Sequence, residues 1–184
     1  MTILGISGSL RRGSHNSELL RAAADLLPPG VELDWFHGLK AVPAYDEDED
    51  VEPAPPAVSA LREAIGSADA VLIATPEYNA SIPGQLKNAL DWASRPFPEN
   101  SIRGKPVAVI GASTGMFGGV WAQAELRKVL GAMGARVLDR DLPVPAAHMA
   151  FHEGGRLHDD QHHSSLEEIV GELMMEVERD RVAA

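Results

Sequence analysis

The sequence contains no cysteine among its 184 residues, which excludes a disulfide framework, a thiolate nucleophile and a cysteine-ligated metal or iron–sulfur site. It also lacks any run approaching the ~20 continuous apolar residues of a membrane helix. The N-terminus does not show the basic and then apolar pattern of a secretory signal. We therefore expect a cytoplasmic protein without a membrane segment, and the length predicts a single domain over residues 1–184.

Basic residues are in short supply. The chain has 16 Lys and Arg against 27 Asp and Glu, a net charge of −11. A negative field of this kind argues against nucleic acid or an anionic membrane as a partner. Six of the acids stand together in residues 46–52, and we expect this run to form a solvated loop. A calcium loop is a poor alternative, because it needs spaced acids with a glycine, whereas these acids are contiguous.

Strand-like and helix-like segments alternate along the chain. Short apolar runs predict strands at residues 3–7, 31–36, 70–75, 106–111 and 135–138. Apolar stripes at helical spacing fall within 17–27, 57–67, 83–93 and 122–133, and a capping box at Ser164 and Ser165 predicts that a last helix begins there. This pattern predicts an α/β fold: a flavodoxin-like, doubly wound, five-stranded parallel sheet in the order 2-1-3-4-5, with helices on both faces.

The loops after strands one, three and four of such a sheet meet at one edge. The first, GSLRRGSHN at residues 8–16, lacks the Gly-Lys-Ser/Thr end of a nucleoside-triphosphate loop and lacks Gly-x-Gly-x-x-Gly. It offers backbone N–H groups, hydroxyls and the Arg11 guanidinium just before the N-terminus of a helix. This combination of donors suits a phosphate monoester. The alternative is an ordinary strand-to-helix turn with capping serines.

The other two loops are as unusual as the first. TPEYNASIPG at residues 75–84 is stiffened by two prolines and suits the edge of a flat polar heterocycle; the alternative is a loop in which Ser81 caps the helix opened by Pro83. GASTGMFGG at residues 111–119 has four glycines that let a backbone approach a ligand closely. Met116 and Phe117 would give this third loop an apolar edge, and the alternative is a flexible turn.

Together, GSLRRGSHN, TPEYNASIPGQLKNALDW and GASTGMFGG, in this order, resemble the NADPH-dependent FMN reductase family, which includes flavin-dependent quinone, chromate and azo-compound reductases. The similarity runs to about Met133 and more loosely to the end. The resemblance implies non-covalent FMN, with NADPH or NADH as co-substrate. It also implies hydride transfer from the nicotinamide to FMN, followed by electron transfer to a quinone, free flavin or similar small-molecule acceptor.

The resemblance also implies site residues. Ser9, Arg11, Ser14 and Asn16 match positions that hold the phosphate; Pro76, Glu77, Tyr78 and Asn79 match the loop along the isoalloxazine; Ser113 matches a contact from the third loop. His15 stands at a variable position, and Tyr45 matches a family position to which we assign no role. No catalytic side chain is assigned, because the flavin carries the chemistry. Glu77 is tempting as a proton donor, but a loop carboxylate beside a helix start is more typical of a structural or solvated group.

Two functions other than a reductase fit parts of the sequence. A flavodoxin-type electron carrier would bind FMN on the same fold without oxidising NAD(P)H directly. A metal protein could use the histidines that follow residue 147: His148, His152, His158, His162 and His163. Their spacing of four binds metal only on a helix, and Glu153-Gly154-Gly155 favours a loop, so we predict no metal site.

Two tryptophans lie off the inward stripes of their helices. Trp92 and Trp121 are each about 120° from the centre of the stripe. With Phe97 nearby, they predict an exposed apolar patch. The alternative is that each ring packs over loops of its own domain. We expect a homodimer or a dimer of dimers, as the family resemblance also implies, in which a partner chain helps to wall the acceptor pocket.

Overall fold

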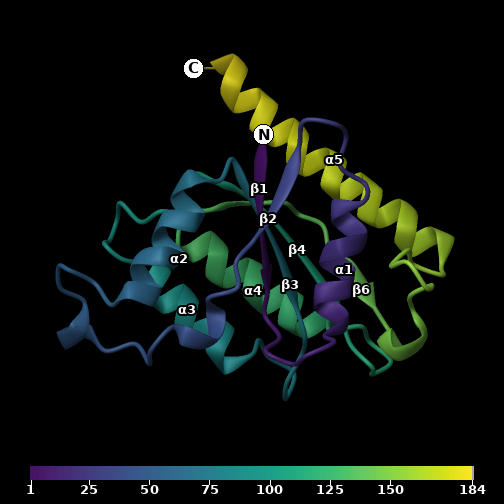
Figure 1. Cartoon of the computed structure of the whole chain (residues 1–184), viewed down its shortest axis with the longest axis horizontal. Coiled ribbons are helices and arrows are strands. Elements are labelled where there is room, and N and C mark those ends of the chain that lie inside the picture. Colours follow the sequence, from purple (N-terminus) through teal and green to yellow (C-terminus); the bar gives the residue numbers. More distant parts are fainter. Residues whose placement is uncertain (184) are drawn as a thin grey trace.

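The computed structural model describes residues 1–183 and contains a parallel sheet. Its strands are β1 (Thr2–Ser7), β2 (Glu32–Trp35), β3 (Ala70–Thr75), β4 (Pro106–Ala112), β5 (Arg136–Val137) and β6 (Pro143–Val144). The order is β2-β1-β3-β4-β5, which confirms the predicted topology. Figure 1 shows β1 to β4 in the middle of the molecule, with α2 and α3 on one side and α1 on the other. Ala184, the last residue of the predicted domain, lies outside the described residues.

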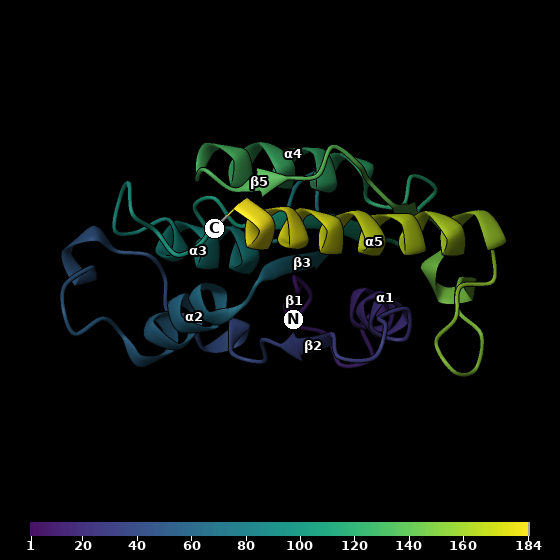
Figure 2. The same ribbon diagram turned by 90° about the horizontal axis from the view of Figure 1, so that it is seen from above.

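Helices cover both faces of the sheet. They are α1 (His15–Ala24), α2 (Pro56–Ser67), α3 (Gly84–Ala93), α4 (Val120–Ala132) and α5 (Asp160–Ala183), with 3₁₀ turns at Leu39–Ala41, Glu47–Glu49 and Ala147–Met149. One apolar cluster packs α2, α3 and α4 against the sheet, and a second packs α1 and α5 against its other face. In Figure 2, α2 and α3 lie on one side of β1 and β3, and α1 lies on the other. No helix within residues 1–183 is long and apolar enough to cross a membrane.

The two central strands explain why both faces are covered. Every residue of β3 and β4 is buried. Along β3, Val71 and Ile73 join one apolar cluster, whereas Leu72 and Ala74 join the other, as the alternation of side chains across a sheet requires. A strand with apolar residues on both sides is stable only between two layers of helices.

The fifth position of the sheet differs from the prediction. The expected strand 135–138 is reduced to β5, and the unpredicted β6 continues along the same side of β4. Between them the chain leaves the ladder, and the Leu142 N–H donates to the side-chain oxygen of Gln123 at 3.0 Å. A buried side chain thus replaces a strand as the hydrogen-bond partner.

The last helix begins earlier than predicted. Ser164 and Ser165 lie inside α5, which starts at Asp160. The carboxylate of Asp159 accepts a hydrogen bond from the His162 N–H at 2.8 Å and caps the first turn. This N–H also lowers the pKa of Asp159. The capping-box pattern at Ser164 and Ser165 therefore does not mark the start of the helix. Asp159, five residues before Ser164, supplies the cap.

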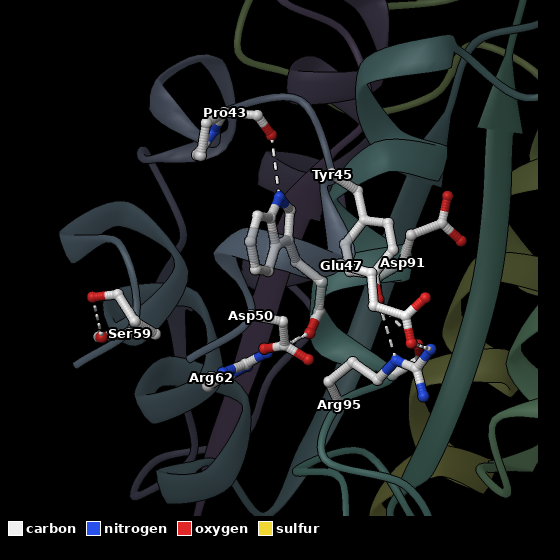
Figure 3. Close-up of polar contacts among 11 residues, drawn as sticks. Pro43, Tyr45, Glu47, Asp50, Ser59, Arg62, Asp91 and Arg95 are labelled. Atoms are coloured by element: carbon white, nitrogen blue, oxygen red, sulfur yellow. Dashed lines mark hydrogen bonds and ion pairs between the residues drawn. The ribbon is translucent and has the colours of Figure 1, made fainter. Parts of the chain in front are cut away.

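Trp92 does not form part of an exposed patch, contrary to the prediction. Its side chain is fully buried, and its indole N–H donates to the Pro43 carbonyl at 3.0 Å. Asn88 donates to the same carbonyl at 2.7 Å, and the Tyr45 ring stands edge-on to the indole at 5.0 Å between centroids. The reason is that the long connection between β2 and α2 packs against α3, with Pro43 and Tyr45 beside the indole (Figure 3).

The acidic run within this connection is mostly exposed, as predicted, but it is anchored. Asp50 lies 2.8 Å from the Arg62 guanidinium, and Glu47 lies 3.8 Å from that of Arg95. Arg95 also donates to the Tyr45 hydroxyl at 3.1 Å. These contacts, drawn in Figure 3, fasten the connection to α2 and to the end of α3.

Trp92→Phe should lower the free energy of unfolding by about 1–3 kcal/mol, because it removes one buried hydrogen bond and leaves a gap where the indole packed. Urea unfolding followed by circular dichroism measures this change. Phe97→Leu is the matched control, since Phe97 is 69% exposed and should change stability by less than about 0.5 kcal/mol. Equal effects of the two substitutions would contradict the assigned role of Trp92.

Candidate functional site

The loops after β1, β3 and β4 surround a cavity of about 240 Å³ at the carboxyl edge of the sheet. Its lining comprises Ser9, Arg11, Ser14, His15, Asn16, Pro76, Glu77, Tyr78, Ala112, Ser113 and Thr114. Every predicted site residue except Asn79 is on this lining. Residues that are more than 100 positions apart in the sequence are thus brought to one place by the parallel topology.

A larger cavity, of about 600 Å³, lies between α1 and residues 151–155, and its lining contains no residue of the second or third loop. Its lining includes three carboxylates, those of Glu18, Asp25 and Glu153, beside Arg21 and His152. Carboxylates repel an anion, so this groove suits a phosphate less well than the smaller cavity does.

The first loop turns the chain into α1. Ser14 is the N-cap residue, is buried, and accepts a hydrogen bond from the Asn16 N–H at 3.2 Å. Gly13 has φ +63°, a conformation that favours glycine and that directs the chain into the helix. Arg11 adds a cation to the cavity lining. Its N–H donates to the Ser9 hydroxyl oxygen at 3.4 Å, so part of the loop's hydrogen bonding is internal.

Asn16 ties the first loop to the third. Its side-chain amide donates to the Ala112 carbonyl at 2.9 Å, and its side-chain oxygen accepts from the Ala112 N–H at 2.9 Å. An asparagine amide has two N–H donors, so one donor remains for a ligand. Asn16, which was predicted to contact a phosphate, therefore also joins the first loop to the end of β4.

The second loop closes with a two-residue turn. Tyr78 and Ser81 exchange backbone hydrogen bonds of 3.0 and 3.1 Å, and Asn79 and Ala80 between them have φ values of +55° and +57°. Positive φ at both central residues is the signature of a type I′ turn. Asn79 therefore lies at the tip of the turn and is not on the cavity lining, whereas Tyr78 lies on its rim.

The alternative interpretation of this loop, in which Ser81 caps α3, is wrong. Its hydroxyl donates to the Glu125 carboxylate on α4 at 2.6 Å, and no described N-cap side chain bonds to the start of α3. Glu77 likewise turns to α4, where its carboxylate accepts from the Trp121 and Ala122 N–H groups at 3.0 and 3.1 Å. The side chains of Glu77 and Ser81 are thus both directed to the neighbouring helix.

Gln123 on α4 bonds the third loop through its side chain, a role that was not predicted from the sequence. The side chain of Gln123 is fully buried and donates to the Gly118 and Gly119 carbonyls at 3.4 and 3.5 Å. A Cβ on Gly118 would lie 2.4 Å from the Pro143 carbonyl carbon, so only glycine fits against β6. The available signal was a glutamine between Ala122 and Leu126, beside the inward stripe of an otherwise apolar helix face.

The rim of the third loop is apolar, as predicted. Met116 and Phe117 are exposed, and the Phe117 ring stands edge-on to that of Trp121 at 4.9 Å between centroids. Ser113 lies deeper, where its hydroxyl oxygen accepts from the Gly115 N–H at 3.1 Å. Ser113 therefore lies on the cavity lining, whereas the exposed apolar side chains of Met116 and Phe117 lie further along the same loop and off the lining.

The donor set of the first loop fits a phosphate monoester. It combines two serine hydroxyls, a guanidinium and the N-terminus of α1, where backbone N–H groups and the helix dipole favour an anion. The carboxylate of Glu77, the acidic side chain on the lining, is bonded to α4. A group that carries a phosphate at one end and a flat ring at the other matches this polarity.

The histidines near the C-terminus do not form a metal cluster. His148 lies in a 3₁₀ turn and His152 in a loop, and the His152 and His158 rings pack at 3.6 Å between centroids. His162 and His163 lie on α5. Within residues 1–183, no group of three or more histidine, aspartate or glutamate side chains is arranged to hold a metal ion.

Comparison with known proteins identifies the family of the chain. The family model described as NADPH-dependent FMN reductase matches residues 1–149. An NAD(P)H-dependent FMN reductase of Pseudomonas aeruginosa is 45% identical over 180 residues, covering 97% of this chain and 96% of the relative. A quinone reductase of Escherichia coli K12 is 40% identical over 141 residues, covering 76% of this chain and 74% of the relative.

The structural comparison extends over nearly the whole chain. The flavoenzyme NAD(P)H:(acceptor) oxidoreductase FerB from Paracoccus denitrificans has a TM-score of 0.84 and 35% identity, with 97% of each chain covered. With the family match over residues 1–149, these similarities show that the chain belongs to the NADPH-dependent FMN reductase family.

Proposed function

We propose that the protein binds FMN non-covalently in the cavity at the carboxyl edge of the sheet, oxidises NADPH or NADH, and reduces a quinone, free flavin or similar small molecule. The observation that carries the proposal is the convergence of eight predicted FMN contacts on one cavity lining. The names of the relatives support the acceptor class, since they include quinone reductases and a 2-hydroxy-1,4-benzoquinone reductase of a Burkholderia species.

In this proposal the first loop holds the phosphate through Ser9, Arg11, Ser14 and Asn16. The second and third loops flank the ring, with contacts from Pro76, Tyr78, Ser113 and the backbone of Glu77, whereas Asn79 lies at the tip of the turn and off the lining. When bound, FMN supplies the redox chemistry, because it takes up a hydride from a reduced nicotinamide and passes two electrons to the acceptor. The protein's own contribution is to bind and orient, and no side chain is assigned to proton transfer.

The charge distribution explains why Arg11 matters to this proposal. The chain as a whole carries −11 and repels an anionic cofactor. A local cation and a helix N-terminus at the first loop counter that repulsion at short range. The Asn16–Ala112 bridge then fixes this loop against the end of β4.

The first test separates a reductase from an electron carrier. FMN-loaded protein mixed with NADPH or NADH under argon should lose its visible flavin absorbance without a partner enzyme, and a benzoquinone should restore it. Free FMN at the same concentration is the control. If neither nucleotide bleaches the bound flavin although dithionite does, the protein is a carrier of the flavodoxin type, and the proposed activity is wrong.

Arg11→Glu should weaken FMN binding by about 10- to 100-fold, because it replaces a charge-assisted contact worth about 1.5–3 kcal/mol with a repulsive carboxylate. Riboflavin, which lacks the phosphate, should bind almost unchanged. Quenching of flavin fluorescence measures both affinities. Arg12→Glu is the matched control, since Arg12 is the neighbouring arginine and is not on the cavity lining. An equal loss for FMN and riboflavin would refute the phosphate contact.

We further propose a cytoplasmic homodimer, or a dimer of dimers, whose interface includes the exposed apolar side chains of the third loop and of the start of α4. Trp92 is buried and is not part of the predicted patch, but Trp121 and Phe117 are exposed and in contact with each other, and the neighbouring Met116 is also exposed. Apolar side chains gathered at one place on a surface are typical of an interface. A partner chain seated there would complete the wall of the acceptor pocket.

Static light scattering at micromolar concentration should give the mass of two or four chains for the wild type. Trp121→Glu should shift the protein toward a single chain and weaken FMN retention, because a charge would be buried in the interface. Met175→Glu, at a similarly exposed apolar position on α5, is the control and should leave the mass unchanged. A wild-type mass of one chain would rule out the proposed assembly.

A further inference from the structure

The start of α4 lacks a capping side chain of its own. Its N-cap residue is Gly119, with φ +80° and ψ +29°. The first N–H groups of any helix have no partner within the helix and are usually bonded by a side chain at the N-cap. Glycine has none to offer, so the cap must come from another part of the chain.

Glu77 supplies this cap from the second loop. Its Oε2 atom accepts hydrogen bonds from the Trp121 N–H at 3.0 Å and the Ala122 N–H at 3.1 Å. A Cβ placed on Gly119 would lie 3.7 Å from the Cβ of Glu77, which shows that this side chain passes directly across the glycine. A carboxylate at a helix N-terminus also interacts favourably with the helix dipole.

A second bond fastens the same loop to the same helix. The Ser81 hydroxyl donates to the Glu125 carboxylate, which lies one turn further along α4. Glu77 and Ser81 stand on either side of the two-residue turn at Asn79 and Ala80. The loop is therefore held to α4 at two points, with its strained tip between them.

The start of α4 is also the end of the third loop. The Val120 N–H donates to the Phe117 carbonyl at 3.2 Å, and Gln123 holds the carbonyls of Gly118 and Gly119. A bond from Glu77 to this point links the second loop to the third. Both loops line the same cavity, so the width between them depends on this link.

We infer that Glu77 is a positioning residue: its carboxylate caps α4 in place of Gly119 and sets the spacing between the second and third loops of the cavity. It does not act as a proton donor or as a direct ligand through its side chain. The consequence for FMN affinity rests on the proposed function, whereas the capping role does not.

The geometry predicts which substitutions preserve the cap. Both N–H groups donate to the same oxygen, so the single amide oxygen of Glu77→Gln can accept both. The side chain of Glu77→Asp is one methylene shorter, so its carboxylate does not reach the two N–H groups. Glu77→Ala has no side-chain acceptor. A proton donor would show a different order, because glutamine cannot donate a proton as a carboxylic acid does.

Hydrogen exchange of the full-length protein tests the cap without reference to flavin. In Glu77→Ala and Glu77→Asp, the amides at the start of α4 should exchange about tenfold faster than in the wild type, as expected when a helix cap is lost. Glu77→Gln should stay near the wild type. Glu63→Ala is the matched control, because Glu63 is a solvent-exposed carboxylate on α2. Unchanged exchange in both Glu77→Ala and Glu77→Asp would overturn the inference.

Flavin titration of the same variants tests the spacing. FMN and riboflavin should both bind about tenfold more weakly to Glu77→Ala, because the ring side of the cavity is altered. Glu77→Gln should restore most of the affinity and leave the pH profile of NADPH oxidation unchanged. If Glu77→Gln loses activity as completely as Glu77→Ala while still binding flavin, the carboxylic acid takes part in the reaction and the inference is wrong.

These two measurements keep the inference separate from the proposed function. If the wild type binds no flavin, the proposed function fails, and the exchange data still decide whether Glu77 caps α4. If Glu77→Ala does not fold, the comparison of Glu77→Gln with Glu77→Asp gives the same test, since both retain polar side chains. If the amides at the start of α4 exchange as slowly in Glu77→Asp as in Glu77→Gln, the inferred capping role of Glu77 is wrong.

Discussion

Backbone polar groups that leave a parallel sheet at its carboxyl edge no longer have a neighbouring strand to bond with, and burying them without partners is costly. In this protein, three side chains supply the missing partners around one cavity. Asn16 bonds both polar groups of Ala112, Glu77 bonds the first amides of α4, and Gln123 bonds two carbonyls of the third loop. The shape of the cavity depends on this constraint, because each bond joins one loop to another element.

Side chains also bond backbone carbonyls in the part of the sequence that most resembles the family. In QLKNALDW, the polar side chains of α3 do not face the cavity. Gln85 donates to the carbonyls of Leu39 and Val42, and Asn88 and Trp92 donate to that of Pro43. This helix therefore organises the long connection after β2, whereas the residues just before it belong to the cavity. One continuous motif serves two neighbouring regions.

The sheet and its order could be predicted because they depend on patterns that are local in the sequence. The runs that form β3 and β4 are apolar on both faces, and such runs occur in sheets covered on both sides. The loops of the cavity could be predicted from their composition and from the family resemblance. In both cases the signal lies within about ten neighbouring residues.

What could not be predicted depends on partners far away in the chain. The burial of Trp92 requires Pro43, 49 positions earlier, and helical periodicity carries no information about a loop that folds over the helix. The role of Glu77 requires backbone amides 44 and 45 positions later, and an amide has no sequence signature. The division between β5 and β6 requires the side chain of Gln123. Each of these is a polar contact between segments, which spacing and composition do not encode.

The turn at Asn79 and Ala80 has a consequence for motion at the cavity rim. A left-handed conformation costs a residue with a Cβ roughly 1 kcal/mol, and Ala80 adopts one with φ +57°. That energy is released whenever the tip leaves its place, so local opening there requires less free energy than the hydrogen bonds alone would suggest. The second loop therefore combines a base that is held to α4 at two points with a tip whose displacement is favoured by the release of backbone strain.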